Sequence, residues 1–119
     1  MKYLCLVYGE EAKIREMDDR ECLAYDAALR ESGRCVASEA LEPVATATTV
    51  RVRGGRLAVT DGPFAETKEQ LAGFYLIEAR DLNEAIQLAA KIPPAQVGSI
   101  EIRPIRPIRE SPRIPGRAR

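Results

Sequence analysis

Residues 61–69, "DGPFAETKE", gather an aspartate, a phenylalanine, two glutamates and a lysine between two strand-like stretches. The chain has no histidine, so Ser-His and Cys-His nucleophile activation are excluded, and a general base must be Asp, Glu, Lys, Tyr or a thiolate. Asp61 is therefore the candidate catalytic residue, as a general acid or base. The candidate ligand-binding residues are Tyr25, Phe64, Glu66 and Lys68.

The same loop also has a purely structural interpretation. Pro63 fixes its own φ angle and favours an extended Gly62, although glycine also permits the mirror region. Asp61 can accept backbone N–H groups of its own loop in an Asx-type turn, with Phe64 tucked beneath the loop as an anchor. A rigid corner of this kind and a loop that presents its charges to a ligand are both compatible with the sequence.

The three cysteines, Cys5, Cys22 and Cys35, are widely spaced and form no CxxC pair. An odd number with this spacing argues against a disulfide framework or a zinc site, and each is expected to be a small buried hydrophobic residue. The "RGGR" stretch at 53–56 is a hairpin turn and not a phosphate loop, because no helix start follows it. We therefore expect no metal and no cofactor.

A chain of 119 residues with 45% apolar and 30% charged residues is typical of one soluble globular domain. No apolar run approaches the ~20 residues of a membrane helix. The start, "MKYLCLVYGEE", is expected to be a strand and not a signal peptide. These features predict a cytoplasmic protein without membrane contact.

Residues 1–105 form the predicted domain, and residues 106–119 form an Arg/Pro-rich C-terminal extension. The tail from residue 104 onward, "PIRPIRESPRIPGRAR", holds five arginines and one glutamate but no aromatic residue that could stack on bases. Its Pro-Ile-Arg repeat has the period of polyproline II. We expect a solvated or partner-bound extension and no binding of nucleic acid.

The elements that must position these residues follow from the hydrophobic patterns along the chain. Helical patterns run from about Asp18 to Ser32, and from Asp81, a candidate N-cap with Glu84 as its reciprocal partner, to the stop at Pro93. Strand patterns occupy 2–8, 34–41, 71–80 and 98–105, and a hairpin over 45–60 turns at Gly54-Gly55. The acidic stretch 9–21 is expected to be a connection into the first helix. The order predicts an α+β fold, a ferredoxin-like split βαβ with an inserted β-hairpin.

Two of these strands, at 3–8 and 73–77, are apolar on both alternating faces. Two helices can cover only one face of such a sheet, so a second layer must cover the other face. A second copy of the chain would do this in a homodimer with sheet packed on sheet. The alternative is that the central hairpin folds back over its own sheet.

The stretch "DGPFAETKEQLAGFYLIEA", with "MKYLCLVYG" before it and "LNEAIQLAAKIP" after it, resembles the DGPF group of the YCII-related family over about residues 1–105. The resemblance implies a dimeric α/β barrel of ferredoxin-like protomers. Members of this group are mostly small bacterial proteins of unassigned activity. Some resemble partners of alternative sigma factors by genomic neighbourhood or fusion, which implies a transcription-factor partner.

Many YCII-related proteins resemble enzymes because a histidine and an aspartate share one pocket. This chain departs from that pattern: Cys22, Tyr25 and Asp26 stand on the first helix near where relatives place the histidine, and Asp61 is the strongest acidic candidate left. Two functions follow. The first is a small-molecule-binding or regulatory dimer with a sigma-factor-associated role. The second is a cofactor-independent enzyme of the lyase or isomerase type, which would transfer a proton on a small organic substrate through Asp61. The absence of histidine and of metal or nucleotide motifs favours the first.

Overall fold

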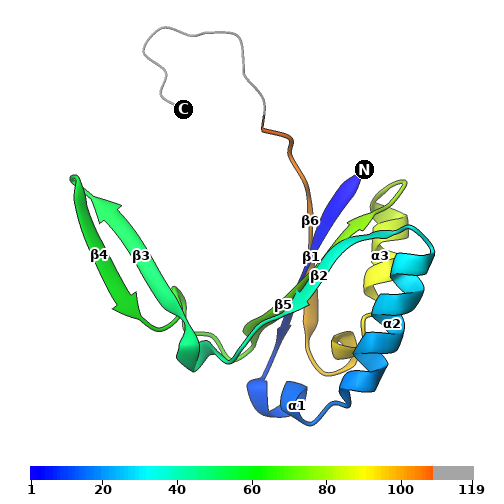
Figure 1. The fold of residues 1–119 in the computed structure, drawn as a ribbon, viewed down its shortest axis with the longest axis horizontal. Helices are drawn as coiled ribbons and strands as arrows, with labels where there is room; N and C mark the ends of the chain where they lie inside the picture. Colours follow the sequence, from blue (N-terminus) through cyan, green and yellow to red (C-terminus); the bar gives the residue numbers. More distant parts are fainter. Residues whose placement is uncertain (109–119) are drawn as a thin grey trace, which may run out of the picture.

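The computed structural model describes residues 1–108 and shows an α+β protein built on a four-stranded antiparallel sheet (Figure 1). The strand order across the sheet is β2-β5-β1-β6. This order is consistent with a ferredoxin-like arrangement, as predicted. The strands are β1 (Lys2–Gly9), β2 (Cys35–Ala40), β5 (Gln70–Glu78) and β6 (Ser99–Pro104). Residues 109–119 of the predicted extension lie outside the described residues.

Both long helices lie on one side of this sheet: α2 (Asp19–Glu31) and α3 (Leu82–Ala89) (Figure 1). Asp18 caps α2 by accepting from the Arg20 N–H at 2.9 Å, and Asp81 caps α3 by accepting from the Glu84 N–H at 2.9 Å. The short α-helix α1 (Glu11–Arg15) occupies the stretch predicted as a connection. It has one turn and no buried residue, so it leaves no hydrophobic period in the sequence. Two 3-10 turns, η1 (Val44–Thr46) and η2 (Pro93–Gln96), complete the described part.

The core lies between the helices and the sheet. Alternate residues of β1 and β5 face the helices, and Cys5 and Ile77 are almost completely inaccessible to solvent. Ile100 and Ile102 of β6 pack against the same cluster, as their alternation predicted. Gly73 is required in β5 because a Cβ atom there would lie 2.8 Å from the Glu39 carbonyl oxygen of β2. The buried hydrophobic side chains of this core are Tyr3, Cys5, Val7, Leu29, Tyr75, Ile77, Ala79, Ala85, Ala89 and Ile92.

The opposite side of the sheet, which we call the open face, is also apolar at its centre. It is formed by the residues that alternate with the core positions of β1 and β5: Leu4, Leu6, Tyr8, Phe74 and Leu76. They are only half-buried, and no described helix covers them (Figure 1). The two-sided apolar character predicted for these strands is therefore present. The predicted homodimer and barrel stay predictions.

The inserted hairpin forms a sheet of its own, which we call the arm (residues 48–61). Its strands, β3 (Thr48–Arg53) and β4 (Arg56–Asp61), pair only with each other in the described chain. Gly54 and Gly55 make the two-residue turn with φ of +57° and +75°, as the sequence predicted. Figure 1 shows the arm projecting beyond the side of the sheet that lacks helices. The alternative in which this hairpin folds back over its own sheet is not what the structure shows.

Candidate functional site

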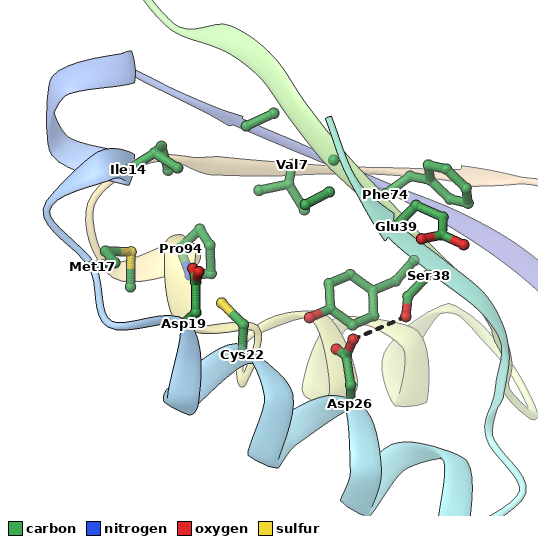
Figure 2. A pocket seen from close by; sticks show the side chains of 14 residues that line it. Val7, Ile14, Met17, Asp19, Cys22, Asp26, Ser38, Glu39, Phe74 and Pro94 are labelled. Atoms are coloured by element: carbon green, nitrogen blue, oxygen red, sulfur yellow. Dashed lines mark hydrogen bonds between the residues drawn. The ribbon is translucent and has the colours of Figure 1, made fainter. Parts of the chain in front are cut away.

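A cavity of about 140 Å³ lies between α2 and the helix-facing side of the sheet (Figure 2). Its size is similar to that of an engineered cavity in another protein that accepts benzene. Most of its walls are apolar, and its polar groups come mainly from α2 and β2. The lining residues are Val7, Ile14, Met17, Asp19, Cys22, Asp26, Ser38, Glu39, Ala40, Ala72, Gly73, Phe74, Tyr75 and Pro94.

Asp26 is the central polar group of this cavity. Its Oδ2 atom accepts a hydrogen bond from the Ser38 hydroxyl at 3.1 Å, drawn as the dashed line in Figure 2. The Ser38 hydroxyl oxygen in turn accepts from the Arg30 guanidinium at 3.2 Å. The other carboxylate oxygen, Oδ1, is buried and makes no hydrogen bond within residues 1–108. Because buried polar atoms are nearly always hydrogen-bonded, this oxygen is free to accept from a donor that reaches it, whether the neighbouring Tyr75 hydroxyl or a group of a ligand.

The helix and the strand bring these groups together through their regular periods. Cys22, Asp26 and Arg30 follow one another at intervals of four on α2, so they lie along one side of that helix. Ser38 is the buried position of β2 and pairs with Tyr75 of β5. Through the family resemblance, the sequence pointed to Cys22, Tyr25 and Asp26 on this helix. It did not predict that β2 would place the Ser38 hydroxyl against the same side of this helix.

The enclosed position of the cavity changes the acidity of its side chains. Burial raises the pKa of the Tyr75 hydroxyl strongly, and the neighbouring Asp26 carboxylate raises it further. Burial also raises the pKa of Cys22, with Asp26 and Asp19 adding to the effect. Both groups therefore stay protonated at neutral pH. Tyr75 is a hydrogen-bond donor here, and Cys22 lacks the thiolate that a nucleophile needs.

Tyr25, a predicted ligand-binding residue, connects the two helices and does not line the cavity. Its hydroxyl donates to the Leu88 carbonyl oxygen at 2.5 Å, and its ring centroid lies 6.1 Å from that of Tyr75. Burial raises the pKa of Tyr25 to about 12, so the hydroxyl keeps the proton that it donates. In this structure Tyr25 joins α2 to α3 behind the site.

Asp61 and the loop 61–69 lie at the base of the arm, apart from the cavity. The Asp61 side chain is exposed and accepts no hydrogen bond within residues 1–108. The expected Asx-type turn does not form. Gly62 has a φ of +111°, and its N–H donates to the Ala47 carbonyl oxygen at 2.8 Å across the base of the arm. The Gly62 carbonyl oxygen accepts from the Thr49 hydroxyl at 2.9 Å, so the backbone of this loop pairs with the strand opposite.

The other predicted residues of the loop are exposed as well. Phe64 is 77% exposed and is not the buried anchor that the structural interpretation required. Its ring lies 5.4 Å from the guanidinium carbon of Arg51, a cation–π distance. Glu66 and Lys68 are exposed on the same loop. The structure thus keeps the loop residues near one another but away from Asp26 and Tyr25.

Beside this loop runs an apolar groove at the base of the arm, which we call the root groove. It joins the open face, through Tyr8 and Leu71, to Val44, Pro63 and Phe64. Its volume is about 550 Å³. In a single chain it is open to solvent, and its lining offers apolar contacts more than directional polar groups.

The described part of the chain holds no cluster of histidine, cysteine, aspartate and glutamate side chains that could bind a metal ion. None of the helices described is long and apolar enough to cross a membrane.

Comparison with known proteins agrees with the resemblance of the DGPF loop and its flanks. The YCII-related domain family matches residues 1–109. An uncharacterized protein of Rhizobium meliloti (strain 1021) is 40% identical over 114 residues, which cover 88% of this chain and 92% of that protein. The chain therefore belongs to the YCII-related family.

Proposed function

We propose that this protein is a homodimer that binds a small organic molecule in the cavity beside Asp26. The observation that supports the proposal is the buried Oδ1 atom of Asp26, which has no hydrogen-bond partner within the described residues and lines a cavity with mainly apolar walls. A ligand that donates a hydrogen bond to this oxygen would remove the cost of leaving it unpaired. Val7, Ile14 and Met17 would contact the apolar part of the ligand.

The charges around the cavity specify the ligand further. Asp19 and Asp26 of α2 line it, and no lysine or arginine among residues 1–108 does. An anionic ligand would therefore meet negative charge without a counter-ion, whereas an ammonium group would form a charge-assisted hydrogen bond with Asp26. The proposed ligand is a compact apolar molecule that carries an amine, or a hydroxyl as the neutral equivalent.

Three six-membered-ring probes of similar size test this proposal: cyclohexylamine, cyclohexanol and cyclohexanecarboxylate. Ligand-observed NMR and calorimetry should detect the amine most strongly and the carboxylate least. Asp26→Asn should weaken binding of the amine by about tenfold or more, because the charge-assisted hydrogen bond becomes a neutral one. Cys22→Phe should prevent binding by filling the cavity.

Asp61→Asn is the matched control, since it makes the same chemical change on an exposed carboxylate outside the cavity. It should leave binding of the amine unchanged. Equal binding of the carboxylate probe, or an Asp26→Asn variant that binds the amine as well as the parent chain, would contradict the proposal.

The second candidate function is proton transfer without a cofactor, and the observation that favours it is the Tyr75 hydroxyl beside the Asp26 carboxylate. Asp26 would remove or return a proton, and Tyr75 would donate a hydrogen bond to the oxygen on which negative charge develops. In this version Asp26 takes the role first expected of Asp61. Exchange of substrate C–H protons in deuterated water tests it: both Asp26→Asn and Tyr75→Phe should abolish exchange, whereas a protein that only binds should show none.

The regulatory role and the transcription-factor partner remain part of the proposal through the resemblance to sigma-factor-associated members of the DGPF group. The homodimer rests on the apolar open face. Light scattering at micromolar concentration should return about twice the 13.1 kDa of one chain.

A further inference from the structure

The arm has one apolar face that nothing in the described chain covers. Val50 pairs with Val59 and Val52 pairs with Leu57, which places these four side chains together on one face of the hairpin. They are between 58% and 68% exposed. Four adjacent aliphatic side chains with this exposure form an apolar patch of the kind that marks an interaction surface.

The other face of the arm is polar. Arg51 pairs with Ala58, Arg53 pairs with Arg56, and Thr49 pairs with Thr60. A strand pair with one apolar and one charged face is typical of a sheet that is half-buried and half-solvated. The arm therefore has the pattern of a covered element, although its own chain does not cover it.

The stability of a lone hairpin also indicates that another surface covers the arm. An isolated two-stranded hairpin is marginally stable at best in water, and it needs a third strand or a packing surface. The arm pairs with no third strand among the described residues. At its base, the Gly62 N–H donates to the Ala47 carbonyl oxygen and the Thr49 hydroxyl donates to the Gly62 carbonyl oxygen. These bonds extend the pairing of the hairpin and do not join it to the four-stranded sheet, from which it points away (Figure 1).

The body offers a surface that matches the arm. The open face carries Leu4 and Leu6 of β1 and Leu76 of β5. The root groove extends this apolar surface from Tyr8 to the base of the arm. Residues 1–108 of one chain thus carry two uncovered apolar surfaces that do not meet each other. Under two-fold symmetry, each surface of one copy can face a surface of the other, which is the requirement for a self-complementary interface.

We infer that residues 48–61 are a dimerisation arm: in the proposed homodimer, the apolar face of each arm binds the body of the second copy. The inference rests on the proposed dimer and adds the arm to its interface. Val50, Val52, Leu57 and Val59 become the buried contacts, and the arginines of the opposite face stay in solvent. Each arm then covers part of the open face and the root groove of the second copy, and two such contacts bring the interface toward the standard size of roughly 800 Å² per partner.

Sedimentation velocity across a concentration series tests the arm with a matched pair of variants. Leu57→Glu places a charge on the apolar face, and Ala58→Glu places the same charge on the adjacent position of the polar face. Leu57→Glu should raise the dimer dissociation constant by ~100-fold or more, because each dimer carries the change twice near the centre of a contact. Ala58→Glu should change it by less than about threefold.

Hydrogen exchange of the parent chain provides a measurement without any substitution. Amides of β3 and β4 should be protected at concentrations at which the protein is dimeric, and they should lose protection on dilution while β1 and β5 keep theirs. Circular dichroism of Leu57→Glu should show the body still folded, since Leu57 touches none of the core residues.

These experiments distinguish failure of the dimerisation-arm inference from failure of the proposed homodimer and of the proposed ligand site. A dimeric parent chain with Leu57→Glu equally dimeric, or with arm amides unprotected, overturns the arm and leaves the dimer standing. A monomeric parent chain at all concentrations overturns both. Neither result bears on the proposed ligand site, because binding of cyclohexylamine at Asp26 is measured independently.

Discussion

The cavity beside Asp26 and the loop 61–69 both hold acidic and aromatic side chains, yet they differ in what surrounds those groups. Asp26 lines a cavity and its Oδ1 atom is buried, whereas Asp61 is exposed at the base of the arm. An enclosed carboxylate feels a low local dielectric and few competing waters, so its interactions with a ligand are strong. An exposed carboxylate in the same chain is screened by solvent. The comparison indicates that burial of the carboxylate, more than the local density of charged residues, is the feature on which to base a candidate site.

The largest difference between the two regions should appear in stability. Ile77→Ala in β5 removes a side chain that is 1% exposed in the core and should destabilise the protein by about 3 kcal/mol. Val59→Ala in the arm removes a side chain that is 58% exposed and should cost less than about 0.5 kcal/mol in the dilute monomer. Urea denaturation at submicromolar concentration measures both. A cost above ~2 kcal/mol for Val59→Ala in the monomer would mean that the arm packs on its own body.

The next effect concerns the two aspartates. Asp26→Asn should stabilise the free protein by about 1 kcal/mol, because it removes a buried charge whose Oδ1 atom has no partner within the described residues. This corresponds to a rise in Tm of about 4 °C for a domain of this size. Thermal unfolding followed by circular dichroism measures it. Asp61→Asn should leave the Tm unchanged, and a fall in Tm for Asp26→Asn would mean that Asp26 stabilises the fold.

Much of this comparison could be predicted from the sequence, and the limits have physical causes. The succession of strands and helices along the chain, the α3 cap at Asp81 and the arm turn at Gly54-Gly55 all follow from short-range patterns. Glu84, the predicted reciprocal partner of that cap, accepts from the Arg80 N–H and not from the N–H of Asp81, a shift of one residue.

The cavity could not be predicted in the same way. It depends on Asp26 and Ser38, which are twelve residues apart and meet only because β2 packs beside α2. The loop 61–69 is a candidate site in the sequence because its charged residues are adjacent there. Its exposure depends on the direction that the base of the arm imposes, which no local pattern specifies.

Glu84 of α3 provides an acid-dependent contrast between the body and the loop. It accepts from the Arg80 N–H at 2.9 Å and pairs with Arg34, and these contacts, the backbone one first, lower the pKa of its carboxyl. A carboxyl with a lowered pKa in the folded state stabilises the fold above its ordinary pKa of 4.5, and this contribution is lost as the pH falls below that value.

Glu84→Gln should therefore lower the Tm at pH 7 and have little effect at pH 3. Thermal unfolding at several pH values measures the difference, with Glu66→Gln of the exposed loop as the control that should follow the parent chain throughout. An equal loss of Tm at both pH values would show that the shape of the Glu84 side chain matters and that its charge does not.

The last effect concerns Phe64, whose contribution in the single chain is also small, and it decides how the loop is used. Phe64 is 77% exposed and its described aromatic contact is the cation–π pair with Arg51, so Phe64→Ala should cost only ~0.5 kcal/mol in the dilute monomer. Urea denaturation at protein concentrations below the dimer dissociation constant gives this value, and a cost near 3 kcal/mol would restore the buried-anchor interpretation.

Phe64 also lines the root groove, which continues the open face. If the second copy covers that groove, the same substitution should raise the dimer dissociation constant by about tenfold while leaving the monomer nearly unchanged. The large aromatic residue of the "DGPF" stretch would then stabilise the assembly and not the fold, which explains why it lies exposed at the base of the arm.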